Sequence, residues 1–179
     1  LGARQVTNSV RPIKTMADLK GLKIRMQPNE THLATFRALG ANPLAMDIKE
    51  VYSALEQKVI DGHENPYALV LTSRFNEVQK HLSNTGHFFD FISVVGNKKK
   101  IESLSAEHQK ILRAAMSKAV AAQRIAATKA DAESLAELQK KGMVYTEMPA
   151  SEREAMRKAT ASVVDDVRKR LGAGMVDQV

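Results

Sequence analysis

The chain has 179 residues, 44% of them hydrophobic and only 4% aromatic, which is enough for one ordinary domain with a mainly aliphatic core. It contains no cysteine, which excludes disulfides, thiolate metal ligands and a cysteine nucleophile. The net charge is +7, but outside Lys98–Lys100 lysine and arginine mostly alternate with acidic residues, so we expect a solvated basic surface and no nucleic-acid partner.

The first predicted elements are a strand, a short helix and a second strand. Arg4–Asn8 alternates as β-strands do. Thr15 and Asp18 form a capping pair for a short helix that ends at Gly21. Leu22–Met26 alternates again and is typical of a buried strand. No apolar run in the chain approaches the roughly 18 residues that a membrane-spanning helix needs.

Helix and strand continue to alternate after this second strand. Asn29 is a capping residue for a helix that Gly40 ends, and a short strand follows at residues 43–46. Asp47 caps the next helix, at residues 48–57.

The middle of the chain contains a polar segment, DGHENP, at residues 61–66. Its successive polar side chains predict a loop. Pro66 suits the first turn of a helix that continues to Phe75. Residues 91–95 are apolar and are interpreted as a further strand.

The last third of the chain is predicted to be mostly helical. Ser105–Lys141 contains neither glycine nor proline, and as one helix it would be about 55 Å long. Gly142 ends it, a short strand follows at residues 143–146, and Ser151 opens a capping box for a helix up to residue 171. The alternation before Val95 predicts an α/β fold, and the long helix is too long to cover only that sheet.

No catalytic or metal-binding motif is found. The five histidines have no metal-ligand spacing, and the chain has no nucleophile elbow, P-loop or dinucleotide fingerprint. We therefore expect no enzyme activity, no metal and no cofactor. An enzyme would have to use His63 or Glu64 as its acid or base, because no other candidate stands out.

Two features allow a functional interpretation beside a structural one. Arg25 lies within an apolar strand, and it is either an exposed edge residue or a planar fork for a carboxylate. Asn65 either caps the helix that begins at Pro66 or offers its amide to a ligand while Glu64 fixes neighbouring donors. Local reasoning does not separate these alternatives.

Several long motifs resemble the solute-binding proteins of tripartite (TRAP) transporters of the DctP type. Residues 18–25 read DLKGLKIR, residues 38–43 read ALGANP, and residues 50–66 read EVYSALEQKVIDGHENP. Residues 75–87 read FNEVQKHLSNTGH. The motifs occur in the order and at the spacing of that family over almost the whole chain, and weaken in about the last thirty residues.

The resemblance implies a two-lobed, class II periplasmic-binding-protein-like α/β clamshell with a mixed sheet and one helix that crosses both lobes. Residues 1–100 would form a ligand-binding lobe and residues 101–142 the lobe-spanning helix. Residues 143–179, a short strand and a C-terminal helix, would pack on a first lobe that we expect to precede Leu1.

The same resemblance implies the ligand-binding residues. Arg25 would form a salt bridge with a ligand carboxylate, Asn65 would hydrogen-bond the same region, and Arg4 would lie near the ligand or the hinge. Glu64 and Gln27 complete this side of the candidate site. Ile48 stands where many members carry an aromatic residue that stacks on the ligand.

The sequence departs from the family pattern at His63, where glutamine is usual. The implied partners are a small organic carboxylate and the membrane permease of a TRAP transporter, and the implied location is the periplasm. The alternative hypothesis is an interaction module without ligand, which would form a homodimer or exchange helices.

Overall fold

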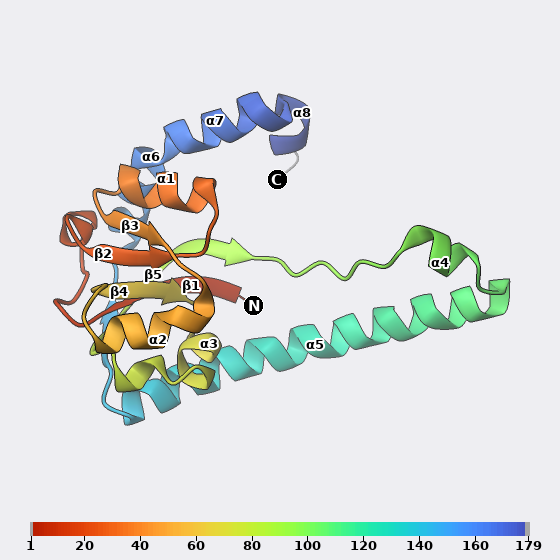
Figure 1. The fold of residues 1–179 in the computed structure, drawn as a ribbon, viewed down its shortest axis with the longest axis horizontal. Coiled ribbons are helices and arrows are strands. Elements are labelled where there is room, and N and C mark those ends of the chain that lie inside the picture. The colour runs from red at the N-terminus through yellow and green to blue at the C-terminus, as the bar shows by residue number, and fades with distance from the viewer. Residues whose placement is uncertain (1, 178–179) are drawn as a thin grey trace.

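The computed structural model describes residues 2–177 and shows one mixed sheet with helices on both faces (Figure 1). The strand order in the sheet is β3-β2-β4-β1-β5-β6. The predicted α/β fold with a mixed sheet is confirmed. The strands are β1 (Gly2–Asn8), β2 (Lys23–Met26), β3 (Asn42–Ala45), β4 (Gly62–Asn65), β5 (His81–Asp90) and β6 (Val144–Glu147).

The direction of β1 decides which chain segments meet at the functional edge of the sheet. β2 runs parallel to β3 and β4, and β5 runs parallel to β6, whereas β1 is antiparallel to both of its neighbours, β4 and β5. The amino end of β1 therefore lies beside the carboxyl ends of β4 and β5. We call this side of the sheet, where Arg4, Arg25, Asn65 and Asp90 end up, the carboxyl edge.

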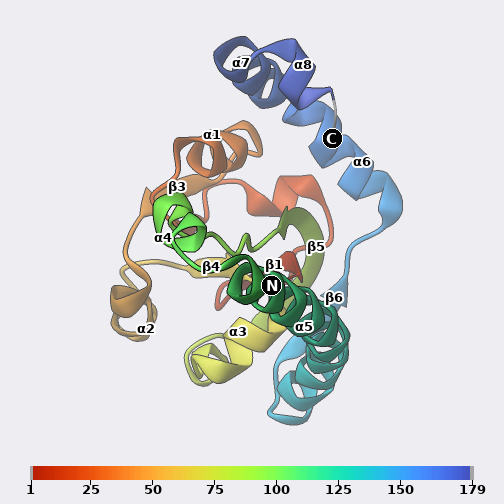
Figure 2. The same cartoon turned by 90° about the vertical axis from the view of Figure 1, so that its right-hand side faces the viewer.

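Helices cover the two faces of the sheet (Figure 2). On one face α1 (Glu30–Ala38), a 3₁₀ helix (Met16–Leu19) and α6 (Ala150–Ala159) enclose a core around Phe36, Ile24 and Met156. On the other face α2 (Ile48–Glu56), α3 (Tyr67–Thr72), a 3₁₀ helix (Phe75–Glu77) and the end of α5 (Ala106–Lys140) enclose Val70, Phe75 and Leu138. Each such fully buried side chain stabilises the fold by about 1.5–3 kcal/mol relative to exposure.

The predicted long helix is confirmed. α5 has 35 residues, begins after Ser105, whose side chain accepts a hydrogen bond from the His108 amide, and ends just before Gly142. Only Ser134 and Leu138 of this helix are buried. The part of α5 before residue 129 projects from the lobe beside an extended segment and α4 (Lys98–Glu102) (Figure 1). We call residues 91–128 the arm.

The prediction of a loop at residues 61–66 is wrong. Residues Gly62–Asn65 form β4, and all four are buried near the centre of the sheet. A Cβ atom on Gly62 would lie 2.0 Å from the Thr7 carbonyl oxygen, so glycine is needed where β4 passes β1. The strand escaped prediction because its buried side chains are polar and are partnered only by distant segments.

The strand predicted at residues 91–95 is also wrong. That segment has no regular structure, and Phe91 and Val95 are 82% and 87% exposed. The real strand, β5, precedes it and is rich in polar side chains, among them Ser83 and Thr85, which are buried by packing and hydrogen bonding. Hydrophobicity alone therefore places the strand ten residues too late.

The C-terminal segment differs from its prediction as well. β6 pairs with β5, and Met148 and Met156 enter the core of this lobe, so β6 and α6 do not pack on a separate lobe as expected. Proline rather than Ser151 occupies the N-cap of α6. Thr160 separates α6 from α7 (Ala161–Leu171), which is followed by α8 (Ala173–Val176). None of the helices within residues 2–177 combines the length and the hydrophobicity that a bilayer-spanning helix requires.

Candidate ligand-binding site

An ion pair between β1 and β4 forms the centre of the carboxyl edge. Arg4 is 3% exposed and Glu64 is fully buried. Both Nε and Nη2 of Arg4 donate to the Glu64 carboxylate, the second at 2.7 Å, and Nη2 also donates to the Asn65 Oδ1 atom at 3.0 Å. The register places Val6 opposite Glu64. Arg4 lies two residues before Val6 on β1, so its side chain projects from the same face of the sheet as that of Glu64.

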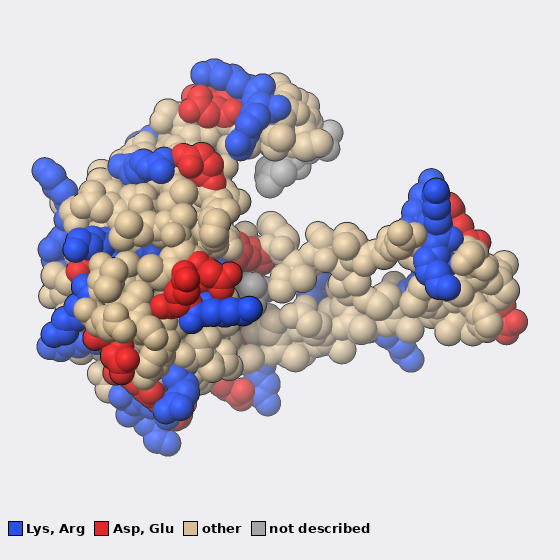
Figure 3. All heavy atoms as spheres, viewed as in Figure 1, with Lys and Arg blue, Asp and Glu red and all other residues tan. Residues whose placement is uncertain are grey.

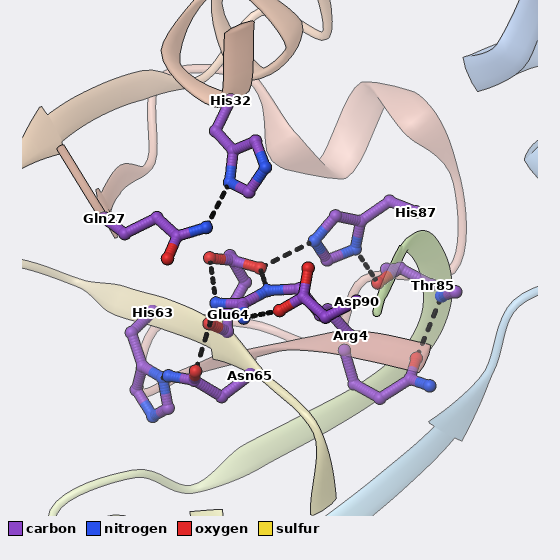
Figure 4. Close-up of polar contacts among 11 residues, drawn as sticks. Arg4, Gln27, His32, His63, Glu64, Asn65, Thr85, His87 and Asp90 are labelled. Carbon is purple, nitrogen blue, oxygen red and sulfur yellow. Dashed lines mark hydrogen bonds and ion pairs between the residues drawn. The ribbon is translucent and has the colours of Figure 1, made fainter. Parts of the chain in front are cut away.

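Three residues of β5 complete this cluster (Figure 4). His87 Nε2 lies 3.1 Å from Glu64 Oε2, and its Nδ1 lies 2.7 Å from the Thr85 hydroxyl. Asp90 accepts a hydrogen bond of 2.5 Å from Arg4 Nη1. Burial raises the pKa of Glu64, but the contacts with His87 and Arg4 outweigh it and lower this pKa to about 2, so Glu64 is ionised.

The Asn65 amide is held in one orientation by two partners. Its Oδ1 accepts from Arg4, and its Nδ2 donates to His63 Nδ1 at 3.0 Å. His63 is fully buried with its ring 4.3 Å from that of Phe75, and burial lowers its pKa to about 3, so it is neutral. Asn65 does not donate or accept at a helix N-cap, because Pro66 occupies that position of α3.

Arg25 lies next to this cluster but forms no ion pair with its carboxylates. It is 3% exposed and lies opposite His63 in the register of β2 and β4. Its Nε and Nη2 donate to the Met46 carbonyl oxygen at 2.9 and 2.7 Å. Among residues 2–177, Nη1 has no hydrogen-bond partner and no carboxylate forms a salt bridge with Arg25. Because β2 is an inner strand, the interpretation of Arg25 as an exposed edge residue is wrong.

Comparison with known proteins identifies the family. A family model described as bacterial extracellular solute-binding protein, family 7 (DctP), matches residues 1–170. The chain belongs to this family. The predicted resemblance is thereby confirmed, and family 7 consists of solute-binding transport proteins rather than enzymes.

Two relatives of this family 7 chain are named for the acids that they bind. The 2,3-diketo-L-gulonate-binding periplasmic protein YiaO of Escherichia coli (strain K12) is 49% identical over 111 residues, which are 62% of this chain and 34% of the relative. The C4-dicarboxylate-binding periplasmic protein DctP of Rhodobacter capsulatus is 31% identical, with 98% of this chain and 53% of the relative covered.

A solved structure agrees closely with the fold. The sugar acid binding protein DctPAm of Advenella mimigardefordensis, in complex with galactonate, has a TM-score of 0.91 and 32% identity. The match covers 99% of this chain and 57% of that protein. The family 7 chain thus spans about a third to somewhat over half the length of these three relatives.

The remaining predicted residues of the family 7 site lie around the same edge. Gln27 follows β2, and its Nε2 donates to His32 Nδ1 at 3.0 Å. The His32 ring in turn stacks on Phe88 at 4.3 Å. Ile48 begins α2 and is 40% exposed, but it takes no part in the polar cluster. The structure therefore brings Arg4, Arg25, Gln27, Glu64 and Asn65 to one edge, and places Ile48 beside it.

Sequence reasoning missed three polar residues of this edge, His32, His87 and Asp90. His87 belongs to the TGH motif that carried part of the family resemblance, so that motif was the signal for it. Asp90 had no signal, because its partner Arg4 lies 86 positions away.

The two residues considered for acid–base chemistry are both committed to structure. His63 is buried and neutral, and the Glu64 carboxylate is occupied by Arg4 and His87. Neither group is free to exchange a proton with a bound acid. In residues 2–177 no group of three or more histidine or acidic side chains could hold a metal ion.

Proposed function

We propose that this chain forms one wall of the solute-binding cleft of a TRAP-transporter receptor. The receptor captures a small organic carboxylate in the periplasm, does no chemistry on it, and delivers it to the membrane permease. The names of the family 7 relatives support the solute class and the location. They leave the individual acid open, because they include a diketo sugar acid, a C4-dicarboxylate and galactonate.

One observation carries the proposal: Arg25 is a buried guanidinium without a carboxylate partner in residues 2–177. A buried charge is costly unless it is paired, and the Met46 carbonyl supplies only a neutral acceptor. Burial lowers the pKa of Arg25 while the carboxylates of Glu64 and Asp47 oppose that shift, and the group still remains charged at neutral pH. A ligand carboxylate at Nη1 would supply the missing anion.

The geometry around Arg25 favours this use. The Met46 contacts hold the guanidinium plane in place, which reduces the entropy lost on binding. A charge-assisted hydrogen bond in such a partly desolvated place contributes roughly 1.5–3 kcal/mol. Closure of a second lobe over the acid would remove water and strengthen the contact, and the ligand's extra contacts in the closed form would supply the energy of closure.

The arm supports the idea that a second body of protein covers this wall. Its exposed apolar side chains are more than a solvated surface requires. They include Phe91, Ile92, Val94, Val95, Ile111 and Ile125. We propose that the arm, α7 and α8 pack against a second lobe, which would place the carboxyl edge inside a cleft.

Substitution of Arg25 tests the proposal. In the complete gene product that contains these residues, a thermal-shift and calorimetric screen would first identify the bound acid among mono- and dicarboxylates, keto acids and sugar acids. Arg25→Lys keeps the charge but loses the fork, so affinity should fall at least tenfold. Arg157→Lys is the matched control, since that side chain is 74% exposed on α6. Equal affinities for wild type and Arg25→Lys would refute the assigned role.

A further inference from the structure

We infer that the preferred ligand has one carboxylate and a hydroxylated tail, as sugar acids and other hydroxy acids do, and that a second carboxylate weakens its binding. The inference rests on the proposed function, because it assumes that the carboxyl edge is the ligand-binding wall. The observation behind it is that both carboxylates of this edge, Glu64 and Asp90, already pair with Arg4, so that Arg25 alone is left for a ligand carboxylate.

The positive charge of Arg4 is not available to a ligand. Its Nε and Nη2 face Glu64, and its Nη1 faces Asp90. All three guanidinium nitrogens are therefore occupied by two carboxylates, and the side chain is only 3% exposed. A ligand carboxylate that approached Arg4 would have to displace a protein carboxylate from it.

Arg25 is then the one guanidinium of this edge that can receive a carboxylate. Arg4 and Arg25 carry two positive charges, and Glu64 and Asp90 carry two negative charges, so these four groups sum to zero. Because Glu64 and Asp90 already pair with Arg4, one ligand carboxylate can pair with Arg25, and a second one would add uncompensated negative charge in a partly desolvated place.

Within residues 2–177, the other basic residues of this edge that do not already contact a carboxylate are either neutral histidines or, for Lys49, outnumbered by neighbouring carboxylates. Burial lowers the pKa of His63 and of His32, so both are neutral at pH 7. The first turn of α2 carries Asp47 and Glu50 beside a single Lys49. The dense run Lys98–Lys100 lies on α4 at the tip of the arm, far from the carboxyl edge (Figure 3).

Neutral hydrogen-bonding groups lie at the same edge of the sheet as Arg25. Gln27 Nε2 donates to His32 Nδ1, which leaves the Nε2–H of this neutral histidine as a donor. Within residues 2–177, the Gln27 carbonyl oxygen and the His32 Nε2 have no hydrogen-bond partner, and both side chains are partly exposed. Asn65 keeps a second amide hydrogen after its bond to His63. Donors mixed with an acceptor suit hydroxyl groups, which do both, better than a carboxylate, which only accepts.

Matched pairs of acids test the inference. Each pair has the same carbon skeleton and differs by one terminal carboxylate: D-galactonate and galactarate, D-gluconate and glucarate, 3-hydroxybutyrate and malate, butyrate and succinate. Titration calorimetry on the complete gene product at pH 7.5 should give at least tenfold tighter binding of the monocarboxylate in every pair that binds. The hydroxylated pairs should bind more tightly than butyrate and succinate.

The outcomes separate this inference from the proposed function. If a dicarboxylate binds as tightly as its monocarboxylate partner, or if succinate binds best, the inference is wrong while the receptor role stands. If no acid binds, the proposed function itself fails. Galactitol, which lacks a carboxylate, should not bind in any case.

A charge change at the edge provides a second test. Asp90→Asn removes one negative charge but keeps an acceptor for Arg4, so the preference for the monocarboxylate over its dicarboxylate partner should fall at least threefold. Glu56→Gln, at the exposed carboxyl end of α2, also removes one negative charge; it is the matched control and should leave the ratio unchanged. An unchanged ratio in Asp90→Asn would contradict the charge argument.

Discussion

The carboxyl edge and the arm are built in opposite ways. At the edge, charged and amide side chains such as Arg4, Glu64 and Asn65 are almost completely buried. On the arm, apolar side chains such as Phe91 and Val95 are almost completely exposed. Buried polar groups that pair with one another are typical of a site that orients a ligand, and clustered exposed apolar groups are typical of a protein interface.

The comparison shows that the residues that stabilise the lobe and the apolar surface that needs a partner lie in different parts of this chain. The charges of Arg4, Glu64 and Asp90 are paired with one another, and these contacts compensate the loss of water. Within residues 2–177, Arg25 lacks a carboxylate partner and the buried Nε2 of His63 lacks a hydrogen-bond partner. Most of the large apolar side chains of the arm are exposed, so they add little to the stability of the lobe. Three predictions test this contrast.

The largest expected effect is the loss of the central carboxylate. Glu64→Ala removes the bidentate partner of buried Arg4 and the partner of His87. We expect the free energy of unfolding, measured with urea on the complete gene product, to fall by about 3–5 kcal/mol. Glu102→Ala on the arm, where Glu102 lies 3.8 Å from Lys98 on an exposed surface, should produce no measurable change. Similar effects of the two substitutions would remove the contrast between edge and arm.

A smaller effect concerns the pH dependence of stability. The folded-state pKa of His63, about 3, lies below its ordinary value of 6.5, so below pH 6.5 the unfolded chain binds a proton that the folded chain does not. Stability therefore falls with falling pH, by about 2 kcal/mol between pH 6.5 and 5, at about 1.36 kcal/mol for each pH unit. Glu64 adds its own loss only as pH falls below 4.5 toward its folded pKa of about 2.

The measurement is a series of urea unfolding curves from pH 7.5 to 5. His63→Gln removes the titrating group and should flatten the slope, although His32 and His81, whose pKa values burial also lowers, keep part of it. His108→Gln, on the exposed arm, should leave the slope as in wild type. A slope that His63→Gln does not change would show that the buried histidine is not its source.

The smallest effect on stability, but a clear one on association, is expected on the arm. The isolated 179-residue chain should self-associate through its exposed apolar surface. Phe91→Ser with Val95→Ser should weaken this association in sedimentation velocity while the melting temperature stays within about one degree, because both side chains are already exposed. Lys99→Ala is the control within the same segment. A wild-type chain that is monomeric at every concentration would contradict the prediction.

Local signals explain which elements could be predicted from the sequence. Asn29 and Asp47 cap α1 and α2 with their side chains as predicted, because a cap depends on residues only two or three positions away. The absence of glycine and proline was enough for α5. β4 and the true position of β5 could not be predicted, because their polar residues are buried only by neighbours from remote parts of the chain.

The candidate site shows the same division. Arg25, Asn65, Arg4, Glu64 and Gln27 were proposed from motifs, and they do converge on one edge. Their pairing could not be predicted. Arg4 is neutralised by Glu64 and Asp90, whereas Arg25 bonds only to a neutral carbonyl, and this pairing depends on the antiparallel insertion of β1 between β4 and β5.

By itself the sequence determined the residue types at the edge, the helix caps, the length of α5 and the family. These follow from short-range spacing and from motifs that are continuous along the chain. The tertiary structure alone decided which charges cancel and which cation remains for a solute, because that depends on which strands become neighbours, and strand neighbours are set by packing over separations of tens of residues.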